Sequence, residues 1–310
     1  MKQLSLEVQN LSKSFGSVKA VQDLSFTVAP GRVTGFLGPN GAGKTTTLRI
    51  LLDLVHADQG TALFGGKRYT ELRHPMSAVG ALLDSGSVHP GRTGHNHMRV
   101  ACAEGGLNPA RIAPLLKLVG LTDAADRRAG GYSLGMLQRL GLATALLGDP
   151  AVLILDEPAN GLDPEGIRWL RSLLQGFAKQ GRTVFLSSHL LGEIQQMAQD
   201  VVIINEGKLV QAGSVEDLEK RQGTTVLVSS PYPEALDSAL KIARFTYSLA
   251  QPDGESQDAH PHQPPTFEVS GVGAEDVGTA ALAGGIPLTH LSEHTTGLED
   301  LFMTLVGGSK

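Results

Sequence analysis

GPNGAGKTT, residues 38–46, is the most informative segment of this chain and consists of Gly38, Pro39, Asn40, Gly41, Ala42, Gly43, Lys44, Thr45 and Thr46. It fits the pattern G-x-x-x-x-G-K-[ST], with an apolar run at 33–37 before it and a helix-like run at 46–52 after it. A glycine-rich loop between a strand and a helix lets main-chain N–H groups converge on phosphate oxygens. The segment therefore predicts an α/β fold that binds a nucleoside triphosphate.

Two side chains of this loop suit the triphosphate and its metal ion. Lys44 carries a cation that we expect to reach the β and γ phosphates, and the Thr45 hydroxyl is a suitable Mg²⁺ ligand. The alternative is a glycine-rich turn without a ligand. It is disfavoured because the motif and both flanking elements occur together.

The bulk composition narrows the class of protein. A net charge of −5 over 310 residues argues against a nucleic-acid binder, which needs a basic surface. The single cysteine, Cys102, excludes an internal disulfide and fits a reducing compartment. No apolar run approaches the roughly 20 residues that cross a bilayer. We therefore expect a cytosolic protein that acts at a membrane only through a partner.

A second strand carries acidic residues at its end. The uninterrupted apolar run 151–155 is typical of a parallel strand covered on both faces, and it ends in Asp156 and Glu157. Ligands of open α/β sheets bind at this edge. Asp156 is predicted to hold Mg²⁺ through water, and Glu157 to face an attacking water molecule. The alternative is a pair of solvated acids at a strand end.

Two further residues have both a functional and a structural interpretation. The buried run 183–188 delivers His189 to the same sheet edge as Lys44 and Asp156, which favours a functional role over a purely structural one. Phe15 stands in a polar turn ahead of the phosphate loop. Its ring either stacks on a purine base or packs under the loop, and the residues alone leave both open.

The remaining elements of the first two thirds follow from periodicity and turn chemistry. Strands are predicted at 4–8 and 20–28 and a short strand with its turn at 60–66, and an apolar run from 79 ends in Asp84. A helical insertion follows, with helices at 109–120 and 124–129. Ser133 heads a further helix that runs to 147, either as a second anion site or as a simple cap. An amphipathic helix at 167–180 and a hairpin of 201–205 with 208–212 complete this part.

The last third has a different pattern. Strands, helices and strands alternate as 226–228, 234–243, 245–249, 267–269, 274–283 and 288–291, with a final helix at 298–306. The order β-α-β-β-α-β predicts a small α+β domain of the ferredoxin-like, split-βαβ type. Residues 251–265 are predicted to be a disordered loop. His260 and His262 in that loop either bind a metal or are simply solvated.

Five motifs in this order resemble the ATP-binding-cassette (ABC) ATPases. They are the phosphate loop, YSLGM-QR at 132–139, LILDEP at 153–158, GLDP at 161–164 and SSHLLGEI at 187–194. The resemblance covers the first two thirds and implies a P-loop cassette at 1–222, with an antiparallel β subdomain and a helical subdomain at about 85–148. Residues 223–310 would form an accessory or regulatory α+β domain. The YSLGM form and the tail GLEDLF at 297–302 are similar to the branch that serves bacterial multidrug and antibiotic exporters.

The resemblance implies a role for each matching residue. Phe15 falls where the family stacks an aromatic ring on adenine, Glu157 where a carboxylate polarises water, and His189 where a residue contacts the γ-phosphate. Ser133 and Gly135 match the signature that closes over ATP bound by a second cassette. One cassette per chain then implies a head-to-tail, twofold dimer.

Two positions depart from the usual family pattern. Asp84 stands where a glutamine links Mg²⁺ to the transmembrane coupling surface; a carboxylate there ligates Mg²⁺, beside Thr45 and Asp156, but donates no amide hydrogen bond. Leu134 replaces the first glycine of the signature and leaves less room near the phosphate.

The expected function is that of a Mg²⁺-dependent ATPase subunit on the inner face of the cell membrane. It would power a separate permease chain that exports a drug, an antibiotic or another hydrophobic compound. The alternative is a cassette ATPase that acts on ribosomes or DNA, but this chain has neither a second cassette with a basic linker nor a long coiled-coil insertion. A P-loop kinase or GTPase would need no signature sequence. Nucleic acid is not an expected partner, and the motifs do not identify the cargo.

Overall fold

The computed structural model describes residues 3–83, 88–221, 224–250 and 265–295. The chain divides into two compact units, Met1–Val215 and Glu216–Lys310. Several predictions fall outside the described residues. They concern Asp84, the loop at 251–265 apart from Pro265, His260 and His262 within that loop, and the final helix at 298–306.

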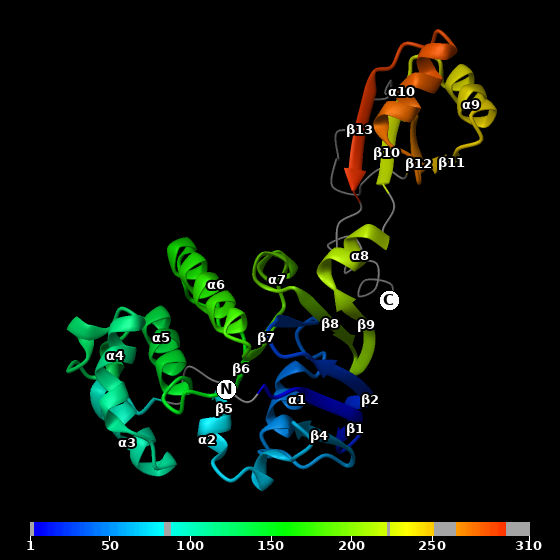
Figure 1. Cartoon of the computed structure of the whole chain (residues 1–310). Coiled ribbons are helices and arrows are strands. Elements are labelled where there is room, and N and C mark those ends of the chain that lie inside the picture. The colour runs from blue at the N-terminus through cyan, green and yellow to red at the C-terminus, as the bar shows by residue number, and fades with distance from the viewer. Residues whose placement is uncertain (1–2, 84–87, 222–223, 251–264, 296–310) are drawn as a thin grey trace. The chain divides into compact units, whose positions relative to one another are not determined.

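The first unit is built around a six-stranded sheet, shown in Figure 1. The strand order is β5 (Val79–Leu82), β6 (Val152–Leu155), β7 (Thr183–Ser188), β3 (Val33–Leu37), β8 (Asp200–Asn205) and β9 (Lys208–Ser214). All neighbours pair in parallel except β8 and β9. Every residue of β3, β6 and β7 is buried, as the uninterrupted apolar runs predict for strands covered on both faces. These three strands therefore end at one edge of the sheet.

The predicted hairpin at the far edge is confirmed. Strands β8 and β9 are joined by Glu206 and Gly207, and both residues have positive φ angles of 48° and 78°. Two consecutive left-handed residues match the twist of a two-residue hairpin.

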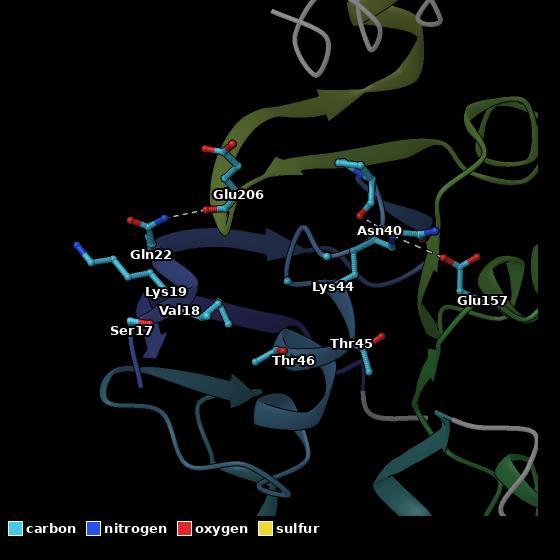
Figure 2. A pocket seen from close by; sticks show the side chains of 14 residues that line it. Ser17, Val18, Lys19, Gln22, Asn40, Lys44, Thr45, Thr46, Glu157 and Glu206 are labelled. Carbon is cyan, nitrogen blue, oxygen red and sulfur yellow. Dashed lines mark hydrogen bonds and ion pairs between the residues drawn. The ribbon is translucent and has the colours of Figure 1, made fainter. Parts of the chain in front are cut away.

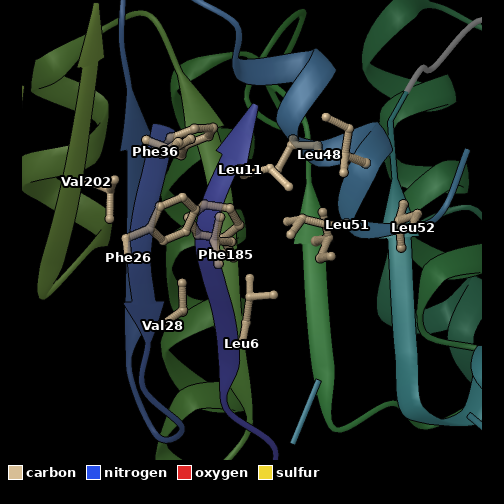
Figure 3. Packing of buried hydrophobic residues seen from close by; sticks show 14 of the residues in the cluster. Leu6, Leu11, Phe26, Val28, Phe36, Leu48, Leu51, Leu52, Phe185 and Val202 are labelled. Atoms are coloured by element: carbon tan, nitrogen blue, oxygen red, sulfur yellow. The ribbon is translucent and has the colours of Figure 1, made fainter. Parts of the chain in front are cut away.

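A smaller antiparallel sheet covers the phosphate-loop side of the unit. Its order is β2 (Val18–Val28), β1 (Leu6–Phe15) and β4 (Gln59–Phe64). The main core lies between this sheet, helix α1 (Lys44–Leu51) and the central sheet, as Figure 3 shows. There Phe26 of β2, Phe36 of β3 and Phe185 of β7 stack with ring centroids 5.1–5.6 Å apart. This contact joins the two sheets and holds the end of β3 in place.

The helical insertion gathers on the side of the unit away from the smaller sheet (Figure 1). It contains α3 (Gly94–Gly105), α4 (Ile112–Leu118) and α5 (Leu134–Ala145), while the short α2 (Pro75–Ala78) precedes β5. A 3₁₀ turn at Pro109–Arg111 leads into α4, so the helix predicted at 109–120 is largely confirmed. Helix α3 was not predicted, since its first turn, Gly-His-Asn-His, has no apolar periodicity. Thr93 caps it by accepting from the Asn96 N–H at 3.1 Å.

The helix predicted at 124–129 is wrong. The structure has two 3₁₀ turns there, Thr122–Ala124 and Ala129–Gly131. Between them Arg128 forms an isolated antiparallel bridge with Thr93, which holds the chain extended. The hydroxyl of Tyr132 donates to the Ala124 carbonyl at 2.5 Å, so a carbonyl that a helix would use internally is bonded from outside. Tertiary contacts override the local helical preference at this point.

Three helices follow the acidic strand. The amphipathic helix is α6 (Pro164–Lys179), and Asp163 caps it by accepting from the Gly166 N–H at 2.8 Å. Along the chain, helix α7 (Leu191–Met197) follows β7, and α8 (Val215–Arg221) follows β9.

Among its described residues, the second unit contains most of α8, a four-stranded antiparallel sheet and two further helices. Its elements are β10 (Thr224–Ser229), α9 (Pro233–Ile242), β11 (Thr246–Leu249), β12 (Thr266–Ser270), α10 (Ala274–Ala283) and β13 (His290–Thr295). The strand order β11-β12-β10-β13 is that of a split-βαβ arrangement. The last strand begins two residues later than predicted. Alternate residues of β10 and β12 form a separate core with the two helices, at Val226, Val228, Phe267, Val269, Leu236, Leu240, Val277 and Ala281.

Candidate functional site

The glycine-rich loop joins β3 to α1 at the edge where the parallel strands end. Gly41 and Gly43 have φ angles of 83° and 101°, a region that side chains rarely adopt. A Cβ atom on Gly43 would lie 2.3 Å from the Ala20 carbonyl oxygen, and one on Gly38 would lie 2.5 Å from the Ile204 carbonyl oxygen. The loop is therefore packed against the main chains of β2 and β8, and only glycine fits at these two points.

A cleft of about 620 Å³ opens over this loop (Figure 2). Its walls come from β2, the loop, the first turn of α1, the end of β6 and the β8–β9 turn. They are formed by Ser17, Val18, Lys19, Ala20, Gln22, Pro39, Asn40, Gly41, Gly43, Lys44, Thr45, Thr46, Glu157 and Glu206. The Gln22 side chain donates to the Glu206 carbonyl at 2.7 Å and ties two of the walls together.

Lys44 is folded back onto its own loop. Its Nζ donates to the carbonyls of Gly38 at 2.6 Å and Pro39 at 3.2 Å, and lies 3.6 Å from Oε1 of Glu157. The side chain is only 7% exposed. Burial lowers the pKa of Lys44, and the negative charges of Glu157 and Asp156 act in the opposite direction. The ammonium is thus held at the floor of the cleft, where an anion can reach it.

Asp156 is bonded on both carboxylate oxygens. Oδ2 accepts from the Thr45 hydroxyl at 2.7 Å, and Oδ1 accepts from the Ser187 hydroxyl at 2.5 Å. Thr45 and Asp156 are hard oxygen donors, the kind that Mg²⁺ prefers. Within the part of the chain that the structure describes, no group of three or more His, Cys, Asp or Glu side chains forms a metal cage. The donor set fits a cation that is also ligated by phosphate and water.

Glu157 faces the loop from the end of β6 (Figure 2). Its Oε2 lies 2.9 Å from Nδ1 of His189, and its Oε1 is the atom near Lys44. Because a carboxylate oxygen accepts hydrogen bonds, Nδ1 is the nitrogen that donates to Glu157. The other ring nitrogen lies on the side of the imidazole away from this contact. The main-chain N–H of Glu157 donates to the Ser187 hydroxyl at 2.9 Å. The carboxylate is thus oriented from two strand ends and held beside the Lys44 ammonium.

Seven of the predicted site residues that the structure describes are not part of the cleft walls. Gly38 and Ala42 belong to the loop itself, and Asp156 and His189 bond to Thr45 and Glu157 behind the walls. The other three, Phe15, Ser133 and Gly135, contact none of these groups. Ser133 caps α5 by accepting from the Met136 N–H at 3.2 Å, and Gly135 follows on the first turn. Both are on a different part of the unit from the cleft walls. Gly135 packs closely on the GLDP turn, since a Cβ there would lie 2.8 Å from the Gly161 carbonyl oxygen. Phe15 ends β1 with half of its surface exposed and pairs with Val18, which does line the cleft.

Two buried polar residues of the site were not singled out from the sequence. Ser187 bridges Asp156 and the main chain of Glu157, and Gln138 donates to the Glu157 carbonyl at 3.5 Å. Ser187 lies two residues before His189. Residues two apart in a strand lie on the same face, so the alternation of the strand could have indicated that Ser187 faces the site. Gln138 belongs to the YSLGM-QR motif, but its place on a helix gave no sign of this contact, because a polar residue on a helix is usually exposed.

No helix among the described residues combines the length and the apolar composition that a membrane span requires.

Comparisons with known proteins agree with this geometry. A family model described as "ABC transporter" matches residues 21–160, and a model described as "Domain of unknown function (DUF8746)" matches residues 224–299. The bacitracin transport ATP-binding protein BcrA of Enterococcus faecalis is 33% identical over 318 residues, covering 98% of this chain and 96% of that protein. The lantibiotic transport ATP-binding protein SrtF of Streptococcus pyogenes is 37% identical over 66% of this chain and 89% of its own length. A solved structure titled "Structure of ATP binding subunit of ABC transporter" superposes with a TM-score of 0.63 at 27% identity, covering 70% of this chain and 92% of that one.

Proposed function

The chain belongs to the ATP-binding-cassette family of transporter ATPases, and we propose that it is the ATP-hydrolysing subunit of an exporter with a separate permease chain. The family binds ATP, generally with Mg²⁺. One observation carries the proposal for this chain, a contact among residues that follow three neighbouring strands. The Glu157 carboxylate lies 3.6 Å from Nζ of Lys44 and 2.9 Å from Nδ1 of His189. No observation favours action on ribosomes or DNA.

The residues in and around the cleft have different roles in the transfer of the γ-phosphoryl group to water. The loop N–H groups and Lys44 bind the phosphates, and Thr45 with Asp156 holds Mg²⁺, which supplies charge neutralisation when bound. Glu157 orients the water molecule and takes up its proton. His189 holds the Glu157 carboxylate through Nδ1, and it would donate to the γ-phosphate through its other ring nitrogen when that nitrogen also carries a proton. Phe15 stacks on adenine, and Asp84 is the further proposed Mg²⁺ ligand.

A second copy of the chain completes each site in this proposal. Ser133 and Gly135 lie on the first turn of α5, outside the cleft of their own unit, with the half-exposed Leu134 between them. Main-chain N–H groups at a helix N-terminus suit an anionic ligand, here the γ-phosphate of ATP held by the partner. Two such contacts related by a twofold axis give a head-to-tail dimer. We place the boundary of the cassette at residue 222, with 223–310 as an accessory domain that supports the dimer or regulates turnover.

The permease would dock on a groove of about 330 Å³ beside the helical subdomain. Its walls are formed by Leu52, Leu54, Tyr69, Ala81, Leu82, Leu83, His97, Gly141 and Thr144. Leu54 is 64% exposed and, together with the other apolar side chains of the groove, offers an apolar surface that suits a partner. Leu83 directly precedes Asp84, the proposed link between Mg²⁺ and the permease. Docking here places the chain on the inner face of the membrane.

The proposed cargo is a drug, an antibiotic or another hydrophobic compound. BcrA is named for bacitracin transport and matches this chain over nearly its whole length, and SrtF is named for lantibiotic transport. The permease, rather than this chain, would contact the cargo.

The test compares the wild type with Glu157→Gln, each with and without ATP and Mg²⁺. We expect the variant to bind ATP with unchanged affinity, to keep only a small residual turnover, and to accumulate as a dimer when ATP is present. Glu165→Gln is the matched control, because Glu165 is an exposed acid on the first turn of α6. Normal turnover by Glu157→Gln would overturn the proposed role of Glu157. A variant that binds ATP but stays monomeric would contradict the composite site.

A further inference from the structure

The main chain at Glu157 has an unusual conformation. Its φ angle is 47°, in the left-handed region that a glutamate adopts only when its surroundings hold it there. The N–H on one side donates to the Ser187 hydroxyl at 2.9 Å. The carbonyl on the other side accepts from the Asn160 N–H at 3.2 Å and from the Gln138 amide at 3.5 Å. Both peptide groups of Glu157 are therefore held by hydrogen bonds.

Gln138 brings one of these bonds from a different subdomain. It lies on the second turn of α5 and is only 6% exposed. Its neighbours in the contact between α5 and α6 are mostly apolar, among them Leu142, Pro158 and Leu162. A carbonyl oxygen can only accept a hydrogen bond, so the NH₂ group of Gln138, and not its amide oxygen, faces the Glu157 carbonyl. The amide oxygen, Oε1, is buried and has no partner among the described residues.

Packing alone does not explain a glutamine at this position. A buried amide oxygen without a partner destabilises the folded chain, whereas methionine fills nearly the same space without that penalty. The single bond to the Glu157 carbonyl is what the glutamine contributes and methionine does not. That bond ends on the main chain of the residue whose carboxylate lies 3.6 Å from Lys44.

We propose that Gln138 is a positioning residue for Glu157: its side-chain amide, carried on the signature helix, holds the left-handed main chain that aims the Glu157 carboxylate into the cleft. The inference rests on the proposed role of Glu157 in activating water. Helix α5 is the helix that Ser133 caps. A shift of the signature therefore changes the Gln138–Glu157 bond directly.

The test uses the full chain with Gln138→Met, which keeps the length of the side chain and removes the hydrogen bond. We expect the Kd and KM for ATP to stay unchanged and kcat to fall about 10- to 100-fold, the cost of a misplaced catalytic group. The melting temperature should not fall, because the unpaired oxygen is removed together with the donor. Amide hydrogen exchange in the segment 156–162 should become faster without nucleotide. Gln138→Leu provides a second variant if the methionine variant folds poorly.

Leu142→Met is the matched control, since Leu142 lies on the same helix and in the same contact without a polar atom. It should leave kcat unchanged. The deciding measurement places Gln138→Met in the Glu157→Gln background, where it should not lower the residual rate further. A further loss of the same size would overturn the inference, as would a normal kcat in Gln138→Met alone. Normal turnover by Glu157→Gln would instead overturn the proposed function, so the two failures are distinguishable.

Discussion

The hydroxyl of Ser187 lies 2.5 Å from Oδ1 of Asp156, and it also accepts the main-chain N–H of Glu157 at 2.9 Å. A hydroxyl has one proton to donate, so donation to Asp156 leaves its lone pairs for Glu157. The fully buried Ser187 side chain thereby holds the adjacent residues Asp156 and Glu157, whose carboxylates face different groups. Asp156 turns toward Thr45, and Glu157 turns toward His189 and Lys44.

Replacing Ser187 by alanine is expected to impair turnover more than binding. The change leaves the Glu157 N–H buried without a partner, which costs about 1–3 kcal/mol in the free energy of unfolding. It also removes one hydrogen bond that holds Asp156 and one that holds Glu157. We therefore expect kcat to fall about 10- to 100-fold. Ser188→Ala is the control, because Ser188 is equally buried but bonds to Leu190 and Glu193. Equal losses of kcat in the two variants would contradict this role of Ser187.

Two glycines of the loop should differ sharply when changed to alanine. At Gly43 the φ angle is 101° and the new Cβ would lie 2.3 Å from the Ala20 carbonyl oxygen. Strain and overpacking together should lower the free energy of unfolding by roughly 2–5 kcal/mol. At Gly41 the φ angle is 83°, but nothing lies within 4 Å of a Cβ, so only strain of about 1–2 kcal/mol applies. Denaturant unfolding without nucleotide measures both. Gly41→Ala as destabilising as Gly43→Ala would contradict the packing of the loop against β2.

The strands and the catalytic edge were predictable because local signals coincide there. Each buried parallel strand is a short apolar run. The residues that follow the runs in β3 and β6 line the cleft, and His189, which follows β7, contacts Glu157 beside it. Lys44, Thr45, Asp156 and Glu157 are thus placed together by the alternation of strand and helix alone. No long-range information is needed for them.

What the sequence did not predict depends on contacts between distant residues. Gln138 bonds to a carbonyl 19 residues away, and the segment 124–129 is kept from forming a helix by the Arg128–Thr93 bridge and the Tyr132 hydroxyl. Helix α3 begins with polar residues and is started by its Thr93 cap rather than by an apolar stripe. Periodicity within a segment contains none of this information.

The affinity for ATP should depend on pH through Lys44. Burial lowers the pKa of Lys44 below its usual 10.5, while a bound triphosphate would raise it. Below the lowered pKa the ammonium is fully charged and affinity should be constant. As pH rises through that pKa, binding must first restore the proton, so affinity should fall by about tenfold per pH unit. A titration of ATP binding from neutral pH to pH 10.5 checks this.

Lys44→Arg is the control for that titration, because a guanidinium stays charged over the whole range. Its affinity should be lower at neutral pH but should not show the alkaline fall. An equal fall in both proteins would mean that another group titrates, and a flat curve for the wild type would show that Lys44 keeps its ordinary pKa.

Phe15 offers the clearest test of how the base is held. Its ring is 51% exposed at the end of β1, with Nζ of Lys13 at 5.4 Å from the centroid. Its strand partner is Val18, which lines the cleft. An exposed ring contributes little to folding, so Phe15→Ala should change the free energy of unfolding by less than about 0.5 kcal/mol. Loss of stacking on a base should weaken ATP binding by about 1–3 kcal/mol.

Phe15→Trp should bind ATP at least as well as the wild type, because a larger ring stacks equally well on a purine. Leu209→Ala is the control, since Leu209 is a partly exposed apolar residue that does not line the cleft. Fluorescence titration with ATP and with tripolyphosphate separates the two parts of the ligand. Phe15→Ala should weaken binding of ATP and leave tripolyphosphate unaffected, because the ring contacts only the base. Equal weakening of both ligands would mean that Phe15 supports the phosphate loop instead, which is the packing alternative that the sequence left open.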